Sequence, residues 1–128
     1  MFQGVDHVVI AVKDLDATVK AFETIYGMPA EHGKAPGMKT AHFRMADSFL
    51  EVITNDGDEG PVAKRLVERG DGVYLIAMRT DDVQATLSEL RAKGVRLIGD
   101  PGEGNPVTGQ VFIHPASAGG ILTQIIPR

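Results

Sequence analysis

The chain has 128 residues, enough for one domain with a substantial core, and its 43% hydrophobic and 23% charged residues are typical of a globular protein. A formal net charge of −4 argues against a nucleic-acid-binding surface, and no apolar run reaches the roughly 18 residues of a membrane span. The absence of cysteine excludes disulfides and thiol chemistry. We therefore expect one cytoplasmic domain, residues 1–128, that binds a small molecule rather than nucleic acid or a membrane.

The sequence contains an internal repeat. Residues 6–18 recur as residues 74–86, and each copy is a short apolar run, an acidic residue and an amphipathic stretch that ends at a glycine. A repeat of this size indicates two copies of one supersecondary unit that cannot bury its apolar face alone. We expect residues that differ between the two copies to mark the functional site. The sharpest difference is His7 in the first copy against Leu75 in the second.

The first copy begins with a predicted strand at residues 5–12, which are β-branched and apolar. Asp14 is the expected N-cap of a helix that keeps apolar residues at helical spacing and ends at Gly27. Residues 28–37 contain prolines and glycines and are expected to form a loop. A further short helix is predicted at Val62–Arg69, after Pro61.

Two strands of the first copy form a predicted hairpin, Met38–Met45 and Ser48–Thr54, joined by the Ala46-Asp47 turn. A two-residue turn pairs the residues that flank it, and this register places His42 opposite Glu51. Side chains opposite one another on adjacent strands point to the same face, so His42 and Glu51 are expected to share a face with Arg44.

The second copy repeats this course. Asp81 or Asp82 is expected to cap the helix, and residues 99–109 form a Gly/Pro-rich loop long enough for a mobile lid. The predicted strands are Gly72–Arg79, Val95–Ile98, Gln110–His114 and Ile121–Ile126.

The opening Asp-His-x-x-Ile-Ala-Val-x-Asp-Leu and the closing His-Pro-x-Ser-x-Gly-Gly-x-Leu resemble the vicinal oxygen chelate (glyoxalase-like) superfamily, and most closely its methylmalonyl-CoA epimerase group. The resemblance covers essentially the whole chain. It implies an α+β fold in which two tandem βαβββ modules form a cup-shaped mixed β-sheet with helices on the outside. Module one is expected at about residues 1–56 and module two at about 72–128. The resemblance also implies a homodimer.

The resemblance further implies a divalent metal ion held by one residue from each of four strands, which fall here on His7, Glu51, Leu75 and Gln124. Leucine cannot be a ligand, and Gln124 stands where the family has a glutamate. Imidazole, carboxylate and amide oxygen can all bind a metal. We therefore expect His7, Glu51 and Gln124 as ligands, with His42 as a replacement for the missing one. The alternative is a cleft without metal, in which His7 and Glu51 bond to each other.

The chemistry that the resemblance implies is a metal-assisted proton transfer beside a carbonyl of a small carboxylate or acyl-CoA substrate. Glu51 is the expected catalytic residue, and Arg44, Leu75 and Arg79 are the expected substrate-binding residues. Two alternatives remain open: a metal-free protein that sequesters a drug or metabolite, and an isomerase of the lactoylglutathione lyase kind. The epimerases use a second glutamate that falls in the loop before Met38, where Glu31 is the nearest acid.

Overall fold

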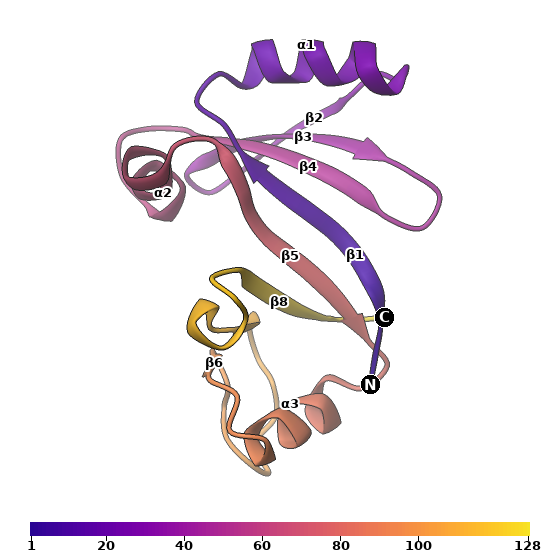
Figure 1. Cartoon of the computed structure of the whole chain (residues 1–128), viewed down its shortest axis with the longest axis vertical. Helices are drawn as coiled ribbons and strands as arrows, with labels where there is room; N and C mark the ends of the chain where they lie inside the picture. The colour runs from indigo at the N-terminus through magenta and orange to yellow at the C-terminus, as the bar shows by residue number, and fades with distance from the viewer. The chain divides into compact units, whose positions relative to one another are not determined.

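The computed structural model describes all residues from Met1 to Arg128 and has a mixed α+β fold, as predicted (Figure 1). None of its helices has the length and apolar content that crossing a membrane would require. The elements in chain order are β1 (Phe2–Ala11), α1 (Leu15–Tyr26), β2 (Glu31–Ala35), β3 (Met38–Arg44), β4 (Phe49–Asn55), α2 (Pro61–Arg69), β5 (Gly72–Thr80), α3 (Val83–Ala92), β6 (Leu97–Ile98), β7 (Val111–Ile113), a 3₁₀ turn (Pro115–Ser117) and β8 (Leu122–Pro127).

The chain divides into two compact units. One unit is His7–Tyr74, and the other combines Met1–Asp6 with Leu75–Arg128. The strand–helix–three-strand order occurs once along each half of the chain, which confirms the two predicted βαβββ modules. The units do not coincide with the predicted modules, because the first unit also contains α2 and the start of β5.

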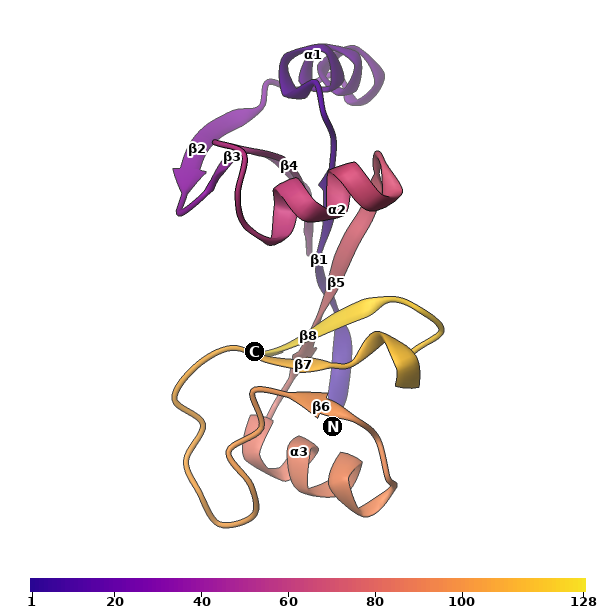
Figure 2. The ribbon, with the colours of Figure 1, turned by 90° about the vertical axis from the view of Figure 1, so that its left-hand side faces the viewer.

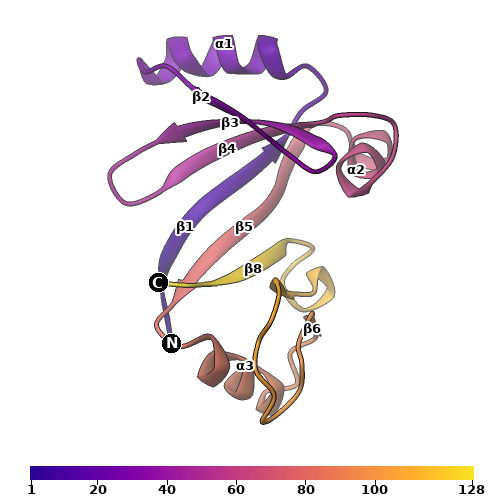
Figure 3. The same cartoon turned by 180° about the vertical axis from the view of Figure 1, so that it is seen from behind.

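In the first unit the strands follow the order β2-β3-β4-β1, with β1 parallel to β4 and the other pairs antiparallel. Helix α1 lies across one face of this sheet (Figure 3). Its Asp14 cap accepts a hydrogen bond from Ala17 N at 3.0 Å, and Gly27 ends it with φ 65°, a left-handed conformation that favours glycine. The buried core between helix and sheet consists of Val12, Leu15, Val19, Ala41, Phe43 and Val52.

In the second unit β5 runs parallel to β8, and β8, β7 and β6 pair antiparallel. Helix α3 lies beside β6 in this unit (Figure 2). Of the two predicted caps, Asp82 caps α3, because its carboxylate accepts from Ala85 N at 3.0 Å. Leu87, Val111 and Ile125 form the buried cluster between the helix and the strands.

The prediction of a loop over residues 28–37 was wrong for Glu31–Ala35, which form strand β2 and pair with β3. Every residue of β2 is exposed, so no alternation of buried and exposed side chains marks the strand in the sequence. The strand completes the βαβββ order of the first module. It also brings Glu31 directly opposite His42.

Ionic contacts attach the segment 99–109 to α3. Arg91 donates two hydrogen bonds of 2.7 Å to the Asp100 carboxylate and one of 2.5 Å to Glu103. Gln84 of the same helix donates to the Asn105 carbonyl at 3.0 Å. The hydrogen bonds from Arg91 lower the pKa of Asp100 below its usual range. The segment predicted as a mobile lid is thus bound to α3 of its own unit by hydrogen bonds between charged side chains.

Replacing Asp100 with Asn is expected to lower the melting temperature by a few degrees at about pH 7. Because the pKa of Asp100 is lowered in the folded chain, its carboxylate stabilises the fold above the ordinary aspartate range, and acid removes this contribution. The difference in melting temperature between the Asp100→Asn variant and the parent should therefore be larger at about pH 7 than at about pH 3. Glu68→Gln, at an exposed pair in which Lys64 Nζ and Glu68 Oε1 lie 4.0 Å apart, is the control. An equal difference at both pH values would contradict the ionic contact.

Candidate active site

The face of the first sheet that is turned away from α1 carries the polar side chains that the sequence singles out. The cross-strand partners are His7 with Phe49, Arg44 with Phe49, and His42 with Glu51. Partners of this kind project to one face, whereas the intervening residues Phe43 and Val52 face α1 in the core. Strands β1, β3 and β4 therefore place two imidazoles, a guanidinium and a carboxylate on one face.

His42 and Glu51 form the central contact of this face. The predicted register is confirmed, and His42 Nε2 is hydrogen-bonded to Glu51 Oε2. Their side chains are 27% and 20% exposed, so both are reachable from solvent but are largely shielded. With one carboxylate oxygen held by the imidazole, the other oxygen, Oε1, remains for a further partner.

Phe49 joins the other side chains of the face to this pair. The His7 ring stacks on Phe49 with centroids 4.4 Å apart and the planes inclined by 13°. The His42 ring lies 5.1 Å from the Phe49 ring, and the Arg44 guanidinium carbon lies 5.6 Å from the ring centroid. Sequence reasoning missed Phe49, although the predicted hairpin register places it directly opposite Arg44.

Arg44 also pairs with an acid from β2. Its Nε donates to Glu31 Oε2 at 2.7 Å, and the two side chains are 64% and 61% exposed. Phe49 and Glu31 thus hold the guanidinium from two directions. Arg44 is the one lysine or arginine that β2, β3 and β4 place on this face, and it marks the part of the face best suited to an anion.

Within the first unit, the predicted ligands His7, His42 and Glu51 do not form a group of three metal-binding side chains. No three His, Cys, Asp or Glu side chains lie together with the geometry to hold an ion. His42 Nε2 is bonded to the Glu51 carboxylate, and the His7 ring lies flat against Phe49. As they lie, these donors do not fit a resident divalent ion. The ligand set His7, His42, Glu51 and Gln124 stays a prediction.

The remaining predicted site residues belong to the second unit, where they share one face of the sheet. Leu75 pairs with Leu122 and Gln124 pairs with Ala77, which puts Leu75, Gln124 and Arg79 on the same side. Leu75 is buried, at 8% exposure. Arg79 donates to Asp6 at 3.2 Å, and both side chains are one-quarter exposed.

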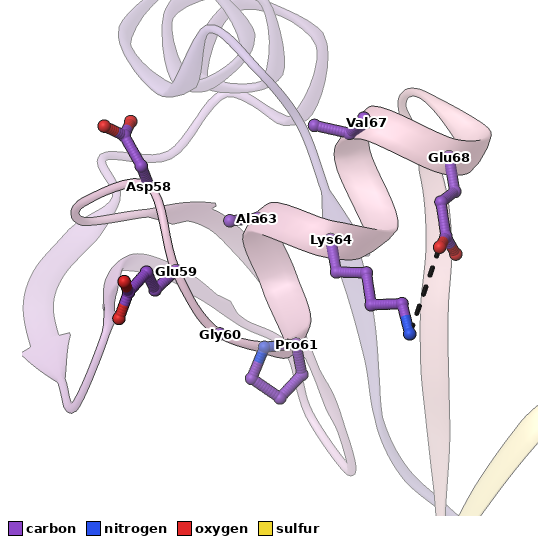
Figure 4. A pocket seen from close by; sticks show the side chains of 8 residues that line it. All are labelled: Asp58, Glu59, Gly60, Pro61, Ala63, Lys64, Val67 and Glu68. Carbon is purple, nitrogen blue, oxygen red and sulfur yellow. Dashed lines mark ion pairs between the residues drawn. The ribbon is translucent and has the colours of Figure 1, made fainter.

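A pocket lies elsewhere in the first unit, around the start of α2 (Figure 4). It measures about 730 Å³ and is lined by Asp58, Glu59, Gly60, Pro61, Ala63, Lys64, Val67 and Glu68. Its ion pair, Lys64 with Glu68, spans 4.0 Å between exposed side chains, and it contains no imidazole. This pocket has no imidazole bonded to a carboxylate, so we place the candidate site at the His42–Glu51 pair.

The Glyoxalase/Bleomycin resistance protein/Dioxygenase superfamily model matches residues 6–112. The chain belongs to this superfamily. No curated protein matches it. The vicinal oxygen chelate resemblance noted in the sequence is thereby confirmed for fold and family.

Solved structures within this superfamily are similar to the chain over nearly its whole length. Methylmalonyl-CoA epimerase from Mycobacterium tuberculosis is 30% identical, with a TM-score of 0.81, over 98% of this chain and 88% of that one. A variant of the Streptomyces coelicolor epimerase in complex with 2-nitronate-propionyl-CoA is 31% identical, with a TM-score of 0.82, over 99% and 98% of the two chains. A methylmalonyl-CoA epimerase in complex with methylmalonyl-CoA and NH4+ is 30% identical, with a TM-score of 0.81, over 99% and 95%.

Proposed function

We propose that the chain is an isomerase of the glyoxalase superfamily that moves a proton on the carbon beside the carbonyl of a small carboxylate or acyl-CoA substrate. The observation that carries this proposal is the bonded His42–Glu51 pair on the solvent-reachable face of the first sheet. A positioned carboxylate beside an imidazole is a general acid–base arrangement. The similar epimerases in complex with acyl-CoA ligands support the substrate class.

In the proposed step, Glu51 Oε1 takes the proton from the substrate carbon. The C–H bond breaks, its electron pair moves into the carbonyl to form an enolate, and the proton rests on the Glu51 carboxylate. His42 Nε2–H donates to Oε2 and keeps the carboxylate in place. Delivery of a proton from water to the opposite face of the enolate inverts the carbon, and Glu51 then releases its proton to water, whereas return of the proton from Glu51 restores the substrate.

In this proposal the positively charged guanidinium of Arg44 pairs with the negatively charged carboxylate of the substrate. A guanidinium presents several N–H donors in one plane and suits a carboxylate. Arg44 lies two residues from His42 on β3, and its position over Phe49 leaves it on the face that carries the catalytic pair. Arg79, Leu75 and Gln124 of the second unit are further proposed substrate contacts, tested by substitution in the same assays.

The experiment is a turnover assay with a single epimer of methylmalonyl-CoA, followed by chiral analysis of the product. Interconversion of the epimers supports the proposal, whereas bound but unaltered substrate contradicts it. The methylglyoxal–glutathione adduct is assayed in parallel, and turnover of that adduct alone would favour a lactoylglutathione lyase-like reaction. Light scattering of the same preparation tests the proposed homodimer.

A metal-free binding protein is the second candidate function. Two observations favour it: Leu75 is buried where the resemblance implies a ligand, and no three donors gather. Metal analysis of protein purified without chelators separates the candidates. A stoichiometric divalent ion that is lost in the His7→Ala variant would support a metal-assisted enzyme. Ligand binding without metal and without turnover would support the binding protein.

A further inference from the structure

We propose that Arg44 forms a carboxylate-binding subsite and that Glu31 is its built-in counter-anion, which an incoming carboxylate displaces. This inference rests on the proposed function for its substrate class and adds how that class is selected. The observation behind it is that the guanidinium is already positioned on an aromatic ring while an acid of the same chain neutralises it.

The position of the guanidinium does not depend on Glu31 alone. Arg44 and Phe49 are direct cross-strand partners, and the guanidinium carbon lies 5.6 Å from the ring centroid. Contact with the ring face stabilises a cation and restricts its plane. Displacing Glu31 therefore leaves Arg44 ordered on Phe49, with donors available to a new acceptor.

The Glu31–Arg44 pair itself is weak enough to be exchanged. The two side chains are 64% and 61% exposed, and ion pairs in such surroundings contribute little because water solvates both charges. Glu31 also lies on β2, a strand whose residues are all exposed. A ligand carboxylate can thus replace Glu31 at small cost in free energy.

The consequence is selectivity for charge. An uncharged ligand cannot replace Glu31 as the anionic partner of Arg44, so it meets a guanidinium whose Nε–H is already bonded to Glu31. A ligand with a carboxylate exchanges one anion for another and gains the donors held on Phe49. The subsite lies beside His42, which is directly opposite Glu31 in the sheet, so the bound carboxylate is next to the proposed catalytic pair.

The test follows the Arg44 Nε–Hε signal by NMR while malonate is added. We expect malonate to shift this signal, and Glu31→Gln to tighten malonate binding about two- to fivefold because the competing anion is gone. Glu68→Gln makes the same change in net charge at an exposed pair on α2 and is expected to leave the affinity unchanged. Malonate that leaves the Arg44 signal in place, or an affinity that Glu31→Gln does not raise, overturns the proposal.

A second measurement compares methylmalonyl-CoA with propionyl-CoA, which lacks the free carboxylate. Arg44→Gln is expected to weaken the binding of methylmalonyl-CoA about tenfold relative to the binding of propionyl-CoA. Arg69→Gln, at an exposed arginine of α2, is the control for net charge. An equal loss of affinity for both ligands overturns the proposed carboxylate subsite even if turnover persists. If neither acyl-CoA binds, the proposed acyl-CoA substrate fails, and the malonate titration still decides the subsite.

Discussion

Replacing Glu51 with Gln is expected to lower kcat for methylmalonyl-CoA epimerisation by about 10²- to 10⁴-fold, the range typical for the loss of a general base. The substitution keeps the shape and the hydrogen-bonding capacity of the side chain toward His42, but the amide accepts no proton from carbon. The effect should fall on kcat rather than on KM, since the proposed role of Glu51 is to accept the reacting proton. The measurement is steady-state kinetics with one pure epimer.

The histidines of the first unit provide the matched comparison. His42→Ala should also reduce kcat, by less than Glu51→Gln, because the carboxylate loses the partner that orients it. His32→Ala is the control, since His32 is exposed on β2 opposite Ala41 and therefore does not share the face of Glu51. Full activity of the Glu51→Gln variant would rule out Glu51 as the base.

Phe43→Ala is expected to destabilise the fold by about 3–5 kcal/mol, as large-to-small changes of buried aromatic residues do. Phe43 is completely buried, and its ring packs edge-on against Phe22 of α1 at 5.8 Å between centroids. The residue follows His42 on β3, so this packing fixes the strand whose other face carries the site. Urea denaturation of the variant and the parent measures the difference in free energy of unfolding.

Val67→Ala is the control for that measurement, because Val67 is 86% exposed on α2. The free energy of unfolding of the Val67→Ala variant should stay within about 0.5 kcal/mol of the parent value, as for most surface substitutions. A loss of less than about 1 kcal/mol in Phe43→Ala would mean that Phe43 is not packed as described.

The sequence predicted the central pair because the turn before β4 leaves little freedom in register. Met45 N donates to Ser48 O at 2.9 Å across Ala46-Asp47, as the two-residue turn requires, and counting outward places His42 opposite Glu51. The cap Asp14 was predicted and Asp82 was one of two candidates, and each bonds to the backbone N–H three residues later. Local geometry determines each of these features.

The features that the sequence did not predict depend on contacts between side chains and between strands, which leave no local sequence pattern. Strand β2 has no buried residue, so its pairing with β3, and with it the position of Glu31, leaves no periodic signal. Phe49 is one apolar residue among several in β4, and only the structure shows three side chains around its ring. The ionic contacts of Arg91 likewise join residues from a helix and a Gly/Pro-rich segment.

Solvent exchange at the substrate carbon detects proton removal by Glu51 whether or not the carbon inverts. Methylmalonyl-CoA is incubated with the protein in D₂O, and deuterium at the carbon beside the thioester carbonyl is followed by NMR. We expect deuterium incorporation with the parent protein and a rate close to background with Glu51→Gln. Binding of methylmalonyl-CoA to the parent without any incorporation of deuterium would contradict the role of Glu51 as the base.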